Sequence, residues 1–351
     1  MEPQSNKLTS SEKSKGDETI GNIWKSLSSF LMRYGTLLMI FILIVVFSKL
    51  QPAFLTTSNW ANILRSIAIT TLVALGVTVS LAANGFDLSV GSTAGLASIM
   101  AASMMIWYQA SMPVTILVSL LMGVLVGLIN AFLIIVIGID DILATLAMLF
   151  IVRGVLQTYA GGVAVHDYMV MTNGKVAPGL ITEEFKFLSQ GYIGPIPVPV
   201  IIVIIIAIMV YLFMNHTRWG RYIYVIGGNK EAAFLSGIRV DRYKMVAYMV
   251  SGLLAAMGGV LLTSRLGTGE LRGGEPFLME SVMAAYVGYS VLSAGKPNAF
   301  GTIIGAIFTG ILVNGMTMLN VPVQALDIFK GIVLVLAVSL HALQRKTQEK
   351  T

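Results

Sequence analysis

The chain has 351 residues, of which 56% are hydrophobic and only 11% are charged, and its mean hydropathy is +0.82. A soluble domain carries roughly 25% charged residues, so this composition nearly excludes a soluble enzyme. The net charge is +6, but the basic residues are confined to the tails and a few loops, which indicates an anionic lipid surface rather than nucleic acid as the partner. Because the chain has no cysteine, disulfides, thiolate metal sites and cysteine nucleophiles are excluded.

The N-terminal segment, residues 1–30, is polar, and we expect it to be a cytosolic tail. No small-residue cleavage site follows the first apolar stretch, so that stretch is interpreted as a retained membrane span. Residues 31–342 are then expected to form one transmembrane domain, and residues 343–351 a short cytosolic C-terminal tail.

Ten apolar stretches are each long enough to cross the hydrocarbon core as a helix of about 20 residues. They are centred on residues 31–47, 62–83, 88–108, 113–138, 142–159, 197–215, 245–263, 279–293, 300–318 and 324–342. The eighth stretch is short, and residues 62–108 can be divided in another way, so nine or eleven spans are the alternatives. The sequence therefore predicts an all-α, polytopic transmembrane helix bundle of about ten spans.

The distribution of basic residues predicts the orientation of the bundle. If the N-terminus is cytosolic, roughly three times as many Lys and Arg residues fall inside as outside, which favours cytosolic N- and C-termini. Two connections are long. Residues 160–196 would form an external loop that can meet an extracytoplasmic partner, and residues 216–244 would form a cytosolic loop that can meet a cytosolic one.

A polar, glycine-containing break lies between the second and third apolar stretches, and Asp87 is at its centre. An ionised Asp in the middle of a span costs roughly 2.5–3.5 kcal/mol on insertion scales, so its presence needs a reason. The sequence favours Asp87 or Ser89 as a cap on the helix that follows. A direct role with a substrate or an ion is the alternative.

Other charged residues also fall close to the spans. Glu280 begins the eighth span, and Asp327 and Lys330 would share a helix face in the tenth, where we expect a local ion pair near the outer surface. Arg153 lies in the fifth span and is expected to snorkel or to pair within the bundle. Glycine pairs at helix-packing spacing favour close helix contacts over a moving pathway, and they are Gly91 and Gly95, Gly123 and Gly127, and Gly301 and Gly305.

Motifs for catalysis are missing from the sequence. The three His residues are far apart, so no metal-ligand cluster is predicted. No phosphate-binding GxxxxGK[ST] motif and no GxSxG motif occur. We therefore expect neither nucleotide hydrolysis nor covalent catalysis by this chain, and no metal site.

The cytosolic loop contains a predicted short helix. Residues 227–229 have the composition of a turn, residues 230–236 favour a helix, and Gly237 can end it. Such a helix, lying parallel to the membrane, is suited to transmit the motion of another protein. A solvated connector is the equally weighted alternative.

Three ordered motifs then make the chain resemble a known family. They are FDLSVG at 86–91, GLIN at 127–130 with ATL at 144–146 and RG at 153–154, and a segment over 217–238 that contains IGGN, EAA and SGI. In these motifs the chain is similar to the membrane permease subunits of ATP-binding-cassette (ABC) importers for ribose, galactose and related monosaccharides. The resemblance covers about residues 35–342. Departures such as Glu280 for Asp and Tyr289 for Gly bear on the substrate and on local detail rather than on the fold.

The resemblance implies a type II ABC importer permease in a bacterial cytoplasmic membrane, where two identical or related permease copies form the pathway. It also implies a cytosolic ABC ATPase subunit that binds ATP and Mg²⁺, and an extracytoplasmic sugar-binding protein. This chain itself would bind no cofactor. Whether the cargo is a pentose, a hexose or another sugar derivative stays open.

The family's coupling segment can be carried over position by position. Coupling to the ATPase is assigned in this way to Gly227, Gly228, Asn229, Glu231, Ala232, Ala233, Ser236 and Gly237. Polar groups near membrane depth, which could exchange hydrogen bonds with sugar hydroxyls, are the candidates for the translocation pathway, and they are Asn84, Asp87, Ser89, Asn130, Thr145 and Glu280.

Two other functions are considered. In a secondary transporter driven by an ion gradient, Asp87, Glu280, Asp327 and Arg153 would belong to an ion or proton relay. A purely structural membrane subunit fits less well, because it would need neither the polar breaks nor the two long loops.

Overall fold

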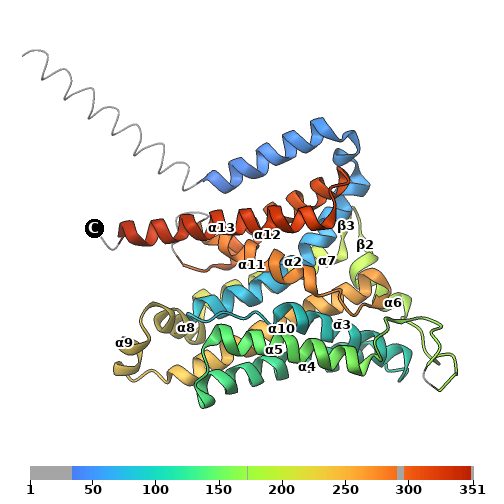
Figure 1. Ribbon diagram of the computed structural model, residues 1–351, viewed down its shortest axis with the longest axis horizontal. Helices are drawn as coiled ribbons and strands as arrows, with labels where there is room; N and C mark the ends of the chain where they lie inside the picture. The colour runs from blue at the N-terminus through green and yellow to red at the C-terminus, as the bar shows by residue number, and fades with distance from the viewer. Residues whose placement is uncertain (1–33, 172, 291–295, 349–351) are drawn as a thin grey trace, which may run out of the picture.

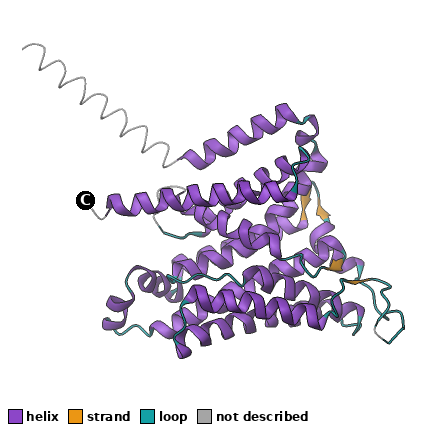
Figure 2. Ribbon diagram, viewed as in Figure 1, coloured by secondary structure: helices purple, strands orange, loops and turns teal. Residues whose placement is uncertain are grey.

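The computed structural model describes residues 34–171, 173–290 and 296–348. Most helices run side by side along the long dimension of the molecule (Figure 1). The few strands are short and lie toward one end of the bundle (Figure 2). The predicted N-terminal tail, residues 1–30, lies outside the described residues, whereas the last helix continues through Gln348, beyond the predicted end of the tenth span.

The elements follow one another in a simple order. The helices are Tyr34–Leu50, α2 Thr57–Ala82, α3 Val90–Ile106, α4 Met112–Phe132, α5 Asp141–Tyr159, α6 Glu183–Gln190, α7 Val198–His216, α8 Arg218–Gly228, α9 Lys230–Leu235, α10 Val240–Leu266, α11 Glu275–Ser290, α12 Ala299–Met318 and α13 Val323–Gln348. A 3₁₀ turn, Pro52–Leu55, precedes α2, and a π-helical turn, Leu133–Ile137, follows α4. The strands are β1 Val165–His166, β2 Tyr192–Ile193, β3 Ile196–Pro197 and β4 Thr268–Gly269.

Six of these helices are long and apolar enough to cross a membrane: α2, α4 with the turn that follows it, α5, α7, α10 and α12. The helix Tyr34–Leu50 and α3 are apolar but shorter. Together with α11 and α13, they occupy the ten predicted stretches, and the all-α polytopic bundle is confirmed.

Helices of the bundle pack closely where a glycine faces the backbone of a neighbouring helix, as between α4 and α10 and between α12 and α11. A Cβ added at Gly127 would collide with the carbonyl oxygen of Tyr248, and one added at Gly305 with that of Ala284. Without a hydrophobic force between helices in lipid, such close approach gains dispersion contacts. The packing interpretation of these glycines is confirmed.

The two long connections are more ordered than simple loops. The first contains α6 and the hairpin of β2 and β3. Its strand β1 pairs in antiparallel register with β4, which follows α10. The second contains two short helices, α8 and α9. The two connections lie at opposite ends of the bundle (Figure 1).

Candidate functional site

The short helix predicted in the second connection is confirmed as α9. Asn229 begins it, because its Oδ1 accepts a hydrogen bond from the Ala232 N–H at 2.9 Å. Gly237 follows it with a φ of +78°, a conformation that glycine adopts without strain. The predicted turn at 227–229 is wrong in its first part, because Gly227 and Gly228 are the last residues of α8. Glycine is required at 227 for another reason: an added Cβ would collide with the Ala82 carbonyl oxygen of α2.

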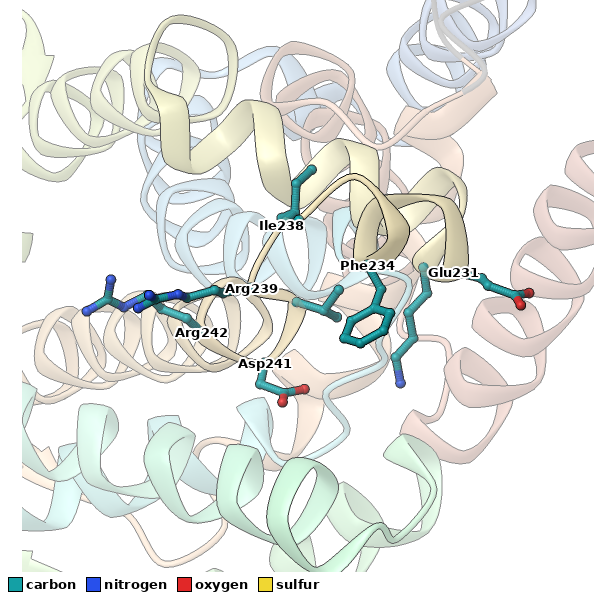
Figure 3. Close-up of a pocket in the computed structure, with 9 residues that line it drawn as sticks. Glu231, Phe234, Ile238, Arg239, Asp241 and Arg242 are labelled. Atoms are coloured by element: carbon teal, nitrogen blue, oxygen red, sulfur yellow. The ribbon is translucent and has the colours of Figure 1, made fainter.

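The surface of α9 combines large apolar side chains with charges. Phe234 is 70% exposed and Leu235 is 79% exposed, whereas Ala233 is buried against α8 and the start of α10. Beside them an open groove of about 1070 Å³ is lined by Glu231, Arg239 and other charged residues (Figure 3). The resemblance did not point to Phe234 and Leu235. The available signal was a pair of large apolar residues between the charged residues 230–231 and the basic residue at 239.

The coupling residues divide into an exposed and a packed set. Glu231, Ala232, Ser236 and Gly237 are exposed, as are Gly228 and Asn229. Ala233 and Gly227 are instead used in packing α9 and α8 onto the bundle. The exposed set can touch a partner, and the packed set can transmit a displacement to the spans.

Asp87 is the centre of a buried polar cluster. Its Oδ1 accepts hydrogen bonds from the Ser89 amide at 3.0 Å and the Ser89 hydroxyl at 2.7 Å, and its Oδ2 accepts one from Ser251 Oγ of α10 at 2.8 Å. Asn130 of α4 donates to Ser89 Oγ at 2.8 Å. These four side chains, at most 1% exposed, join the break before α3 to α4 and α10.

The capping prediction needs correction. Ser89 precedes α3, but its side chain accepts no hydrogen bond from the helix amides. Asp87 instead stabilises the turn before the helix and carries contacts across the bundle. Ser251, which lies far away in the sequence and in no recognised motif, was missed for that reason. The predicted pathway role of Asp87, Ser89 and Asn130 stays a prediction.

The other predicted pathway residues lie in different surroundings. Thr145 Oγ1 is buried and donates to the Phe86 carbonyl at 2.9 Å, which fixes the start of α5 on the break. Asn84 is exposed, has a φ of 54° and lines a cavity. Thr145 and Asn84 therefore border the same break as the aspartate cluster.

Glu280 lies in a separate buried ion pair. Its carboxylate is 3.1 Å from Lys330 Nζ of α13 and accepts a hydrogen bond from Thr70 of α2 at 3.1 Å. The predicted pair of Asp327 and Lys330 spans 3.9 Å and is the longer contact. The predicted local pair is thus present, and Lys330, which is buried, also reaches across to Glu280 of another helix at the shorter distance. The interhelical pair ties α11 and α13 together beside α2.

Arg153 pairs within the bundle, as expected, with Glu275 of α11 at 2.7 Å. Asp87 and Arg153 thus have separate partners from Glu280 and Lys330, and nothing in these contacts supports an ion relay. Among the residues that the structure describes, no group of His, Asp and Glu is arranged to hold a metal ion.

A polar cavity of about 930 Å³ lies at the end of the bundle that carries α8 and α9, and we call it the inner cavity. Its walls include Asn84, Asp141, Lys244 and Tyr286. Asp141 accepts hydrogen bonds from Lys244 at 2.8 Å and from the Tyr248 hydroxyl at 2.9 Å, so α5 and α10 are joined at its edge. Sequence patterns gave no sign of this pair.

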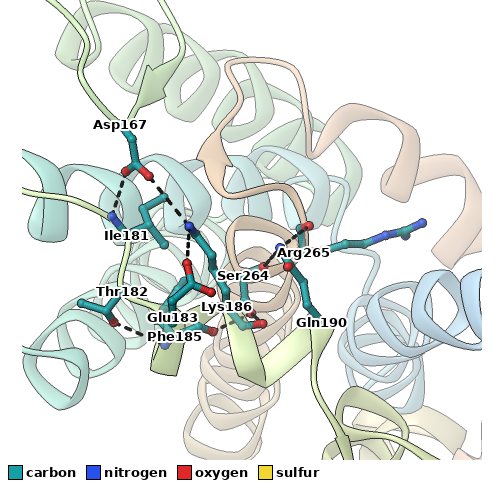
Figure 4. Close-up of polar contacts among 9 residues, drawn as sticks. All are labelled: Asp167, Ile181, Thr182, Glu183, Phe185, Lys186, Gln190, Ser264 and Arg265. Carbon is teal, nitrogen blue, oxygen red and sulfur yellow. Dashed lines mark hydrogen bonds and ion pairs between the residues drawn. The ribbon is translucent and has the colours of Figure 1, made fainter.

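The opposite end of the bundle is held by α6 (Figure 4). Gln190 Nε2 donates to the carbonyls of Ser264 and Arg265, both at 3.1 Å, and Ser264 Oγ donates to the Phe185 carbonyl at 2.6 Å. Lys186 donates to Glu183 at 2.9 Å, and this hydrogen bond raises the pKa of the Lys186 ammonium above its usual value. Helix α6 is thereby fixed on the last turn of α10.

Comparisons with known proteins agree with this architecture. Residues 59–338 match the family model described as the permease component of branched-chain amino acid transport systems. The ribose import permease of Escherichia coli (strain K12) is 33% identical over 313 residues, covering 88% of this chain and 94% of that protein. The ribose import permease of Bacillus subtilis (strain 168) is 35% identical, covering 88% and 92%.

A third relative, the xylose transport system permease of Haemophilus influenzae, is 29% identical over 374 residues and is matched along its whole length. No solved structure matches the chain. The family model covers most of the chain, and the matched region contains the helix bundle, the aspartate cluster and α9. The chain therefore belongs to this family of multi-pass membrane transport permeases.

Proposed function

We propose that this chain is the translocation subunit of an ATP-driven importer for a monosaccharide, and that a separate ABC ATPase docks on α9. The relatives named for ribose and xylose support a sugar as the cargo. The observation that carries the docking proposal is the exposed pair of Phe234 and Leu235 on a short helix bounded by Asn229 and Gly237. Apolar side chains of this size in a charged surface are typical of a protein contact.

The contacts of α8 give the docked helix a route into the bundle. Gly227 packs against the Ala82 carbonyl at the end of α2, and Tyr224 donates a hydrogen bond to the Pro297 carbonyl before α12 at 2.7 Å. A displacement of α8 and α9 therefore moves the break around Asp87 and the start of α12 together. ATP binding by the partner would bias the bundle between two arrangements through these contacts.

The other proposed partners follow from the orientation of the two ends of the bundle. With α8 and α9 in the cytosol of a bacterium, both termini are cytosolic and α6 faces the extracytoplasmic side, where a sugar-binding protein would deliver the cargo. A second permease copy, identical or related, completes the pathway. The tight site then belongs to the binding protein, because a tight site in the permease would slow release.

The test is transport by complexes reconstituted from this permease with a cognate ABC ATPase and a cognate sugar-binding protein. Uptake of D-ribose, D-xylose and D-galactose is measured in proteoliposomes. We expect uptake of at least one sugar to require ATP and to fall at least tenfold in Phe234→Ser/Leu235→Ser, while the amount of folded permease stays unchanged. Uptake that survives without ATP and collapses with the proton gradient would instead support a secondary transporter.

A control variant keeps this test specific. Tyr192 is about half exposed on the opposite end of the molecule, so Tyr192→Ser removes a surface aromatic without touching α9. It should retain ATP-dependent uptake. Equal loss of uptake in both variants would show that exposed apolar side chains matter only for general integrity, and would contradict docking on α9.

A further inference from the structure

An apolar groove follows the end of α4 that lies toward α9, and we call it the α4/α10 groove. It has a volume of about 450 Å³ and lies between α4, with its π-helical turn, and the first turns of α10. Leu128, Phe132 and Ile135 are part of one wall, and Met245 is part of the other. Every residue that α4 and its turn contribute is apolar, so this wall offers no side-chain hydrogen bond to a sugar or to water.

The π-helical turn gives the end of α4 its shape. The turn, Leu133–Ile137, follows the α-helix directly, and Gly138 ends it with a φ of +83°. A single π turn at the end of an α-helix changes the direction of the side chains that follow, and such turns are frequent at functional sites. Here the turn leaves Val136 68% exposed at the edge of the groove.

Both walls of the groove belong to membrane spans. Helix α4 with its turn and helix α10 are each long and apolar enough to cross a membrane. Phe132 is 51% exposed in this wall, and such apolar surface is costly to hydrate. A lipid acyl chain is apolar along its whole length, so it can fill the groove without leaving a polar group unsatisfied.

Two arginines lie where the α4/α10 groove opens toward α9. Arg242 lines both this groove and the open groove beside α9, and Arg239 lines the latter. They are three residues apart at the start of α10 and therefore share a face, and both side chains extend away from Phe234 and Glu231 (Figure 3). Within the described part of the chain, neither arginine forms an ion pair.

The charges at this opening favour a single anionic group. Arg239, Asp241 and Arg242 together carry one net positive charge, and the neighbouring Lys230 and Glu231 cancel each other. A phosphodiester carries one negative charge, and its two free oxygens match the paired donors of a guanidinium group. A zwitterionic head group would bring an additional cation close to two arginines. The opening therefore favours an anionic over a zwitterionic phospholipid.

We propose that the α4/α10 groove binds one anionic phospholipid, with an acyl chain along Phe132 and Ile135 and the phosphate between Arg239 and Arg242. The inference goes beyond the proposed function, because it concerns neither the cargo nor the ATPase. With α9 in the cytosol, as proposed above, the lipid belongs to the inner leaflet. Its head group then lies at the base of α9.

The position of the acyl chain is tested with photoreactive phosphatidylglycerol that carries a diazirine in that chain. The lipid is added in low molar excess to the full-length permease in detergent, and the labelled peptides are identified by mass spectrometry. We expect label on residues 128–136, which unlabelled phosphatidylglycerol removes and phosphatidylcholine does not. Helix α7 is the matched control, because Ile204 and Ile208 form an exposed apolar face on another span. Its labelling should be weak and should not respond to the competitor.

Three results of the labelling experiment would overturn the proposal. The first is no label on residues 128–136, as expected if a second copy of the chain covers the groove instead. The second is equal, competitor-sensitive label on α7. The third is equal competition by phosphatidylcholine, or by glycerol 3-phosphate, which would assign the arginines to a soluble phosphate. Because the labelled protein has its natural sequence, these results do not depend on the folding of a variant.

The role of the arginines is tested by native mass spectrometry of phosphatidylglycerol binding. Arg239→Gln/Arg242→Gln should weaken binding of the first lipid at least fivefold, because it removes both cations from the phosphate. Arg218→Gln/Arg221→Gln is the matched control: it removes two exposed arginines from the same connection without touching the groove, and binding should remain within about twofold of the unmodified chain.

Equal weakening in the two double variants would mean that only the overall positive charge attracts the lipid, and would overturn the site. Unchanged binding in Arg239→Gln/Arg242→Gln would also overturn it. Neither assay uses the ATPase or a sugar. Lipid binding can therefore fail while ATP-dependent uptake succeeds, which separates this inference from the proposed function.

Discussion

The two ends of the bundle are built in contrasting ways. At one end, α6 is attached to α10 through Gln190 and Ser264, and Arg65 of α2 donates to the Gln190 carbonyl at 2.6 Å. At the other end, the side chains of Asn229 and Ser236 make hydrogen bonds to the backbone of α9, and Phe234 and Leu235 are exposed. Helix α6 is tied to its neighbours by side-chain hydrogen bonds, whereas α9 is held by the packing of Ala233 against α8 and α10 and presents Phe234 and Leu235 outward.

Helix α10 connects the two ends. It begins at Val240, directly after α9, and ends at Leu266, beside α6, so it is about 40 Å long at 1.5 Å per residue. Lys244 in its first turns holds Asp141 at the edge of the inner cavity. A movement of α9 is therefore carried along a rigid helix whose far end is fixed, and the inner cavity lies near the moving end.

The largest loss of stability is expected at the buried ion pair of Glu280 and Lys330. Glu280→Leu leaves the Lys330 ammonium buried without its carboxylate, which costs roughly 3–5 kcal/mol in comparable buried pairs. Thermal unfolding of the purified permease should show this loss, and Glu280→Leu/Lys330→Met should recover most of it. If the double variant is no more stable than the single one, the pair does not hold α11 to α13.

The next largest effect is expected at the two adjacent glycines at the end of α8, which should respond differently to substitution by alanine. Gly227→Ala pushes a methyl group into the Ala82 carbonyl and should cost about 1–3 kcal/mol as overpacking does, with a large loss of ATP-dependent uptake. Gly228→Ala has open space and should leave the fold intact. Both are compared by folded yield and by uptake. Similar losses in the two variants would mean that α8 does not move the bundle through Ala82.

The contact between α6 and the last turn of α10 should be weakened by Gln190→Ala. The variant removes two hydrogen bonds to the carbonyls of Ser264 and Arg265, and net contributions of about 1 kcal/mol each are typical. Hydrogen exchange should become faster in α6 and in the last turn of α10 while remaining unchanged in α9. Unchanged protection in α6 would show that this end is held by packing instead.

The smallest effect concerns Lys186 and pH. Its pKa is raised in the folded state by the hydrogen bond to Glu183, so its contribution to stability is complete below the pKa of the unfolded chain and is lost as pH rises through the folded pKa. Unfolding between pH 6 and 9 should therefore show no dependence on this group. Because the pair is partly exposed, Lys186→Met should cost less than about 1 kcal/mol. A clear change between pH 6 and 9 that disappears in Lys186→Met would contradict this assignment.

The helix bundle could be predicted from sequence because lipid imposes a nearly fixed length on every apolar span. Local features such as α9 and its end at Gly237 were also predictable, since capping and glycine conformation act over a few residues. The partners that polar side chains find on distant helices were not predictable. Ser251 binds Asp87 from a distant helix, and Lys330 lies closer to Glu280 than to its sequence neighbour Asp327. Which residues pair across helices depends on how each helix is rotated about its axis, and no local sequence pattern specifies that rotation.

The central claim is that α9 is a cytosolic contact for an energy-supplying partner. It is tested most directly by the reactivity of Leu235→Cys, with a membrane-impermeant maleimide, in intact cells and in inside-out vesicles. We expect modification only in the vesicles, and slower modification when the ATPase is bound. Modification in intact cells, or the same rate with and without the ATPase, would contradict it.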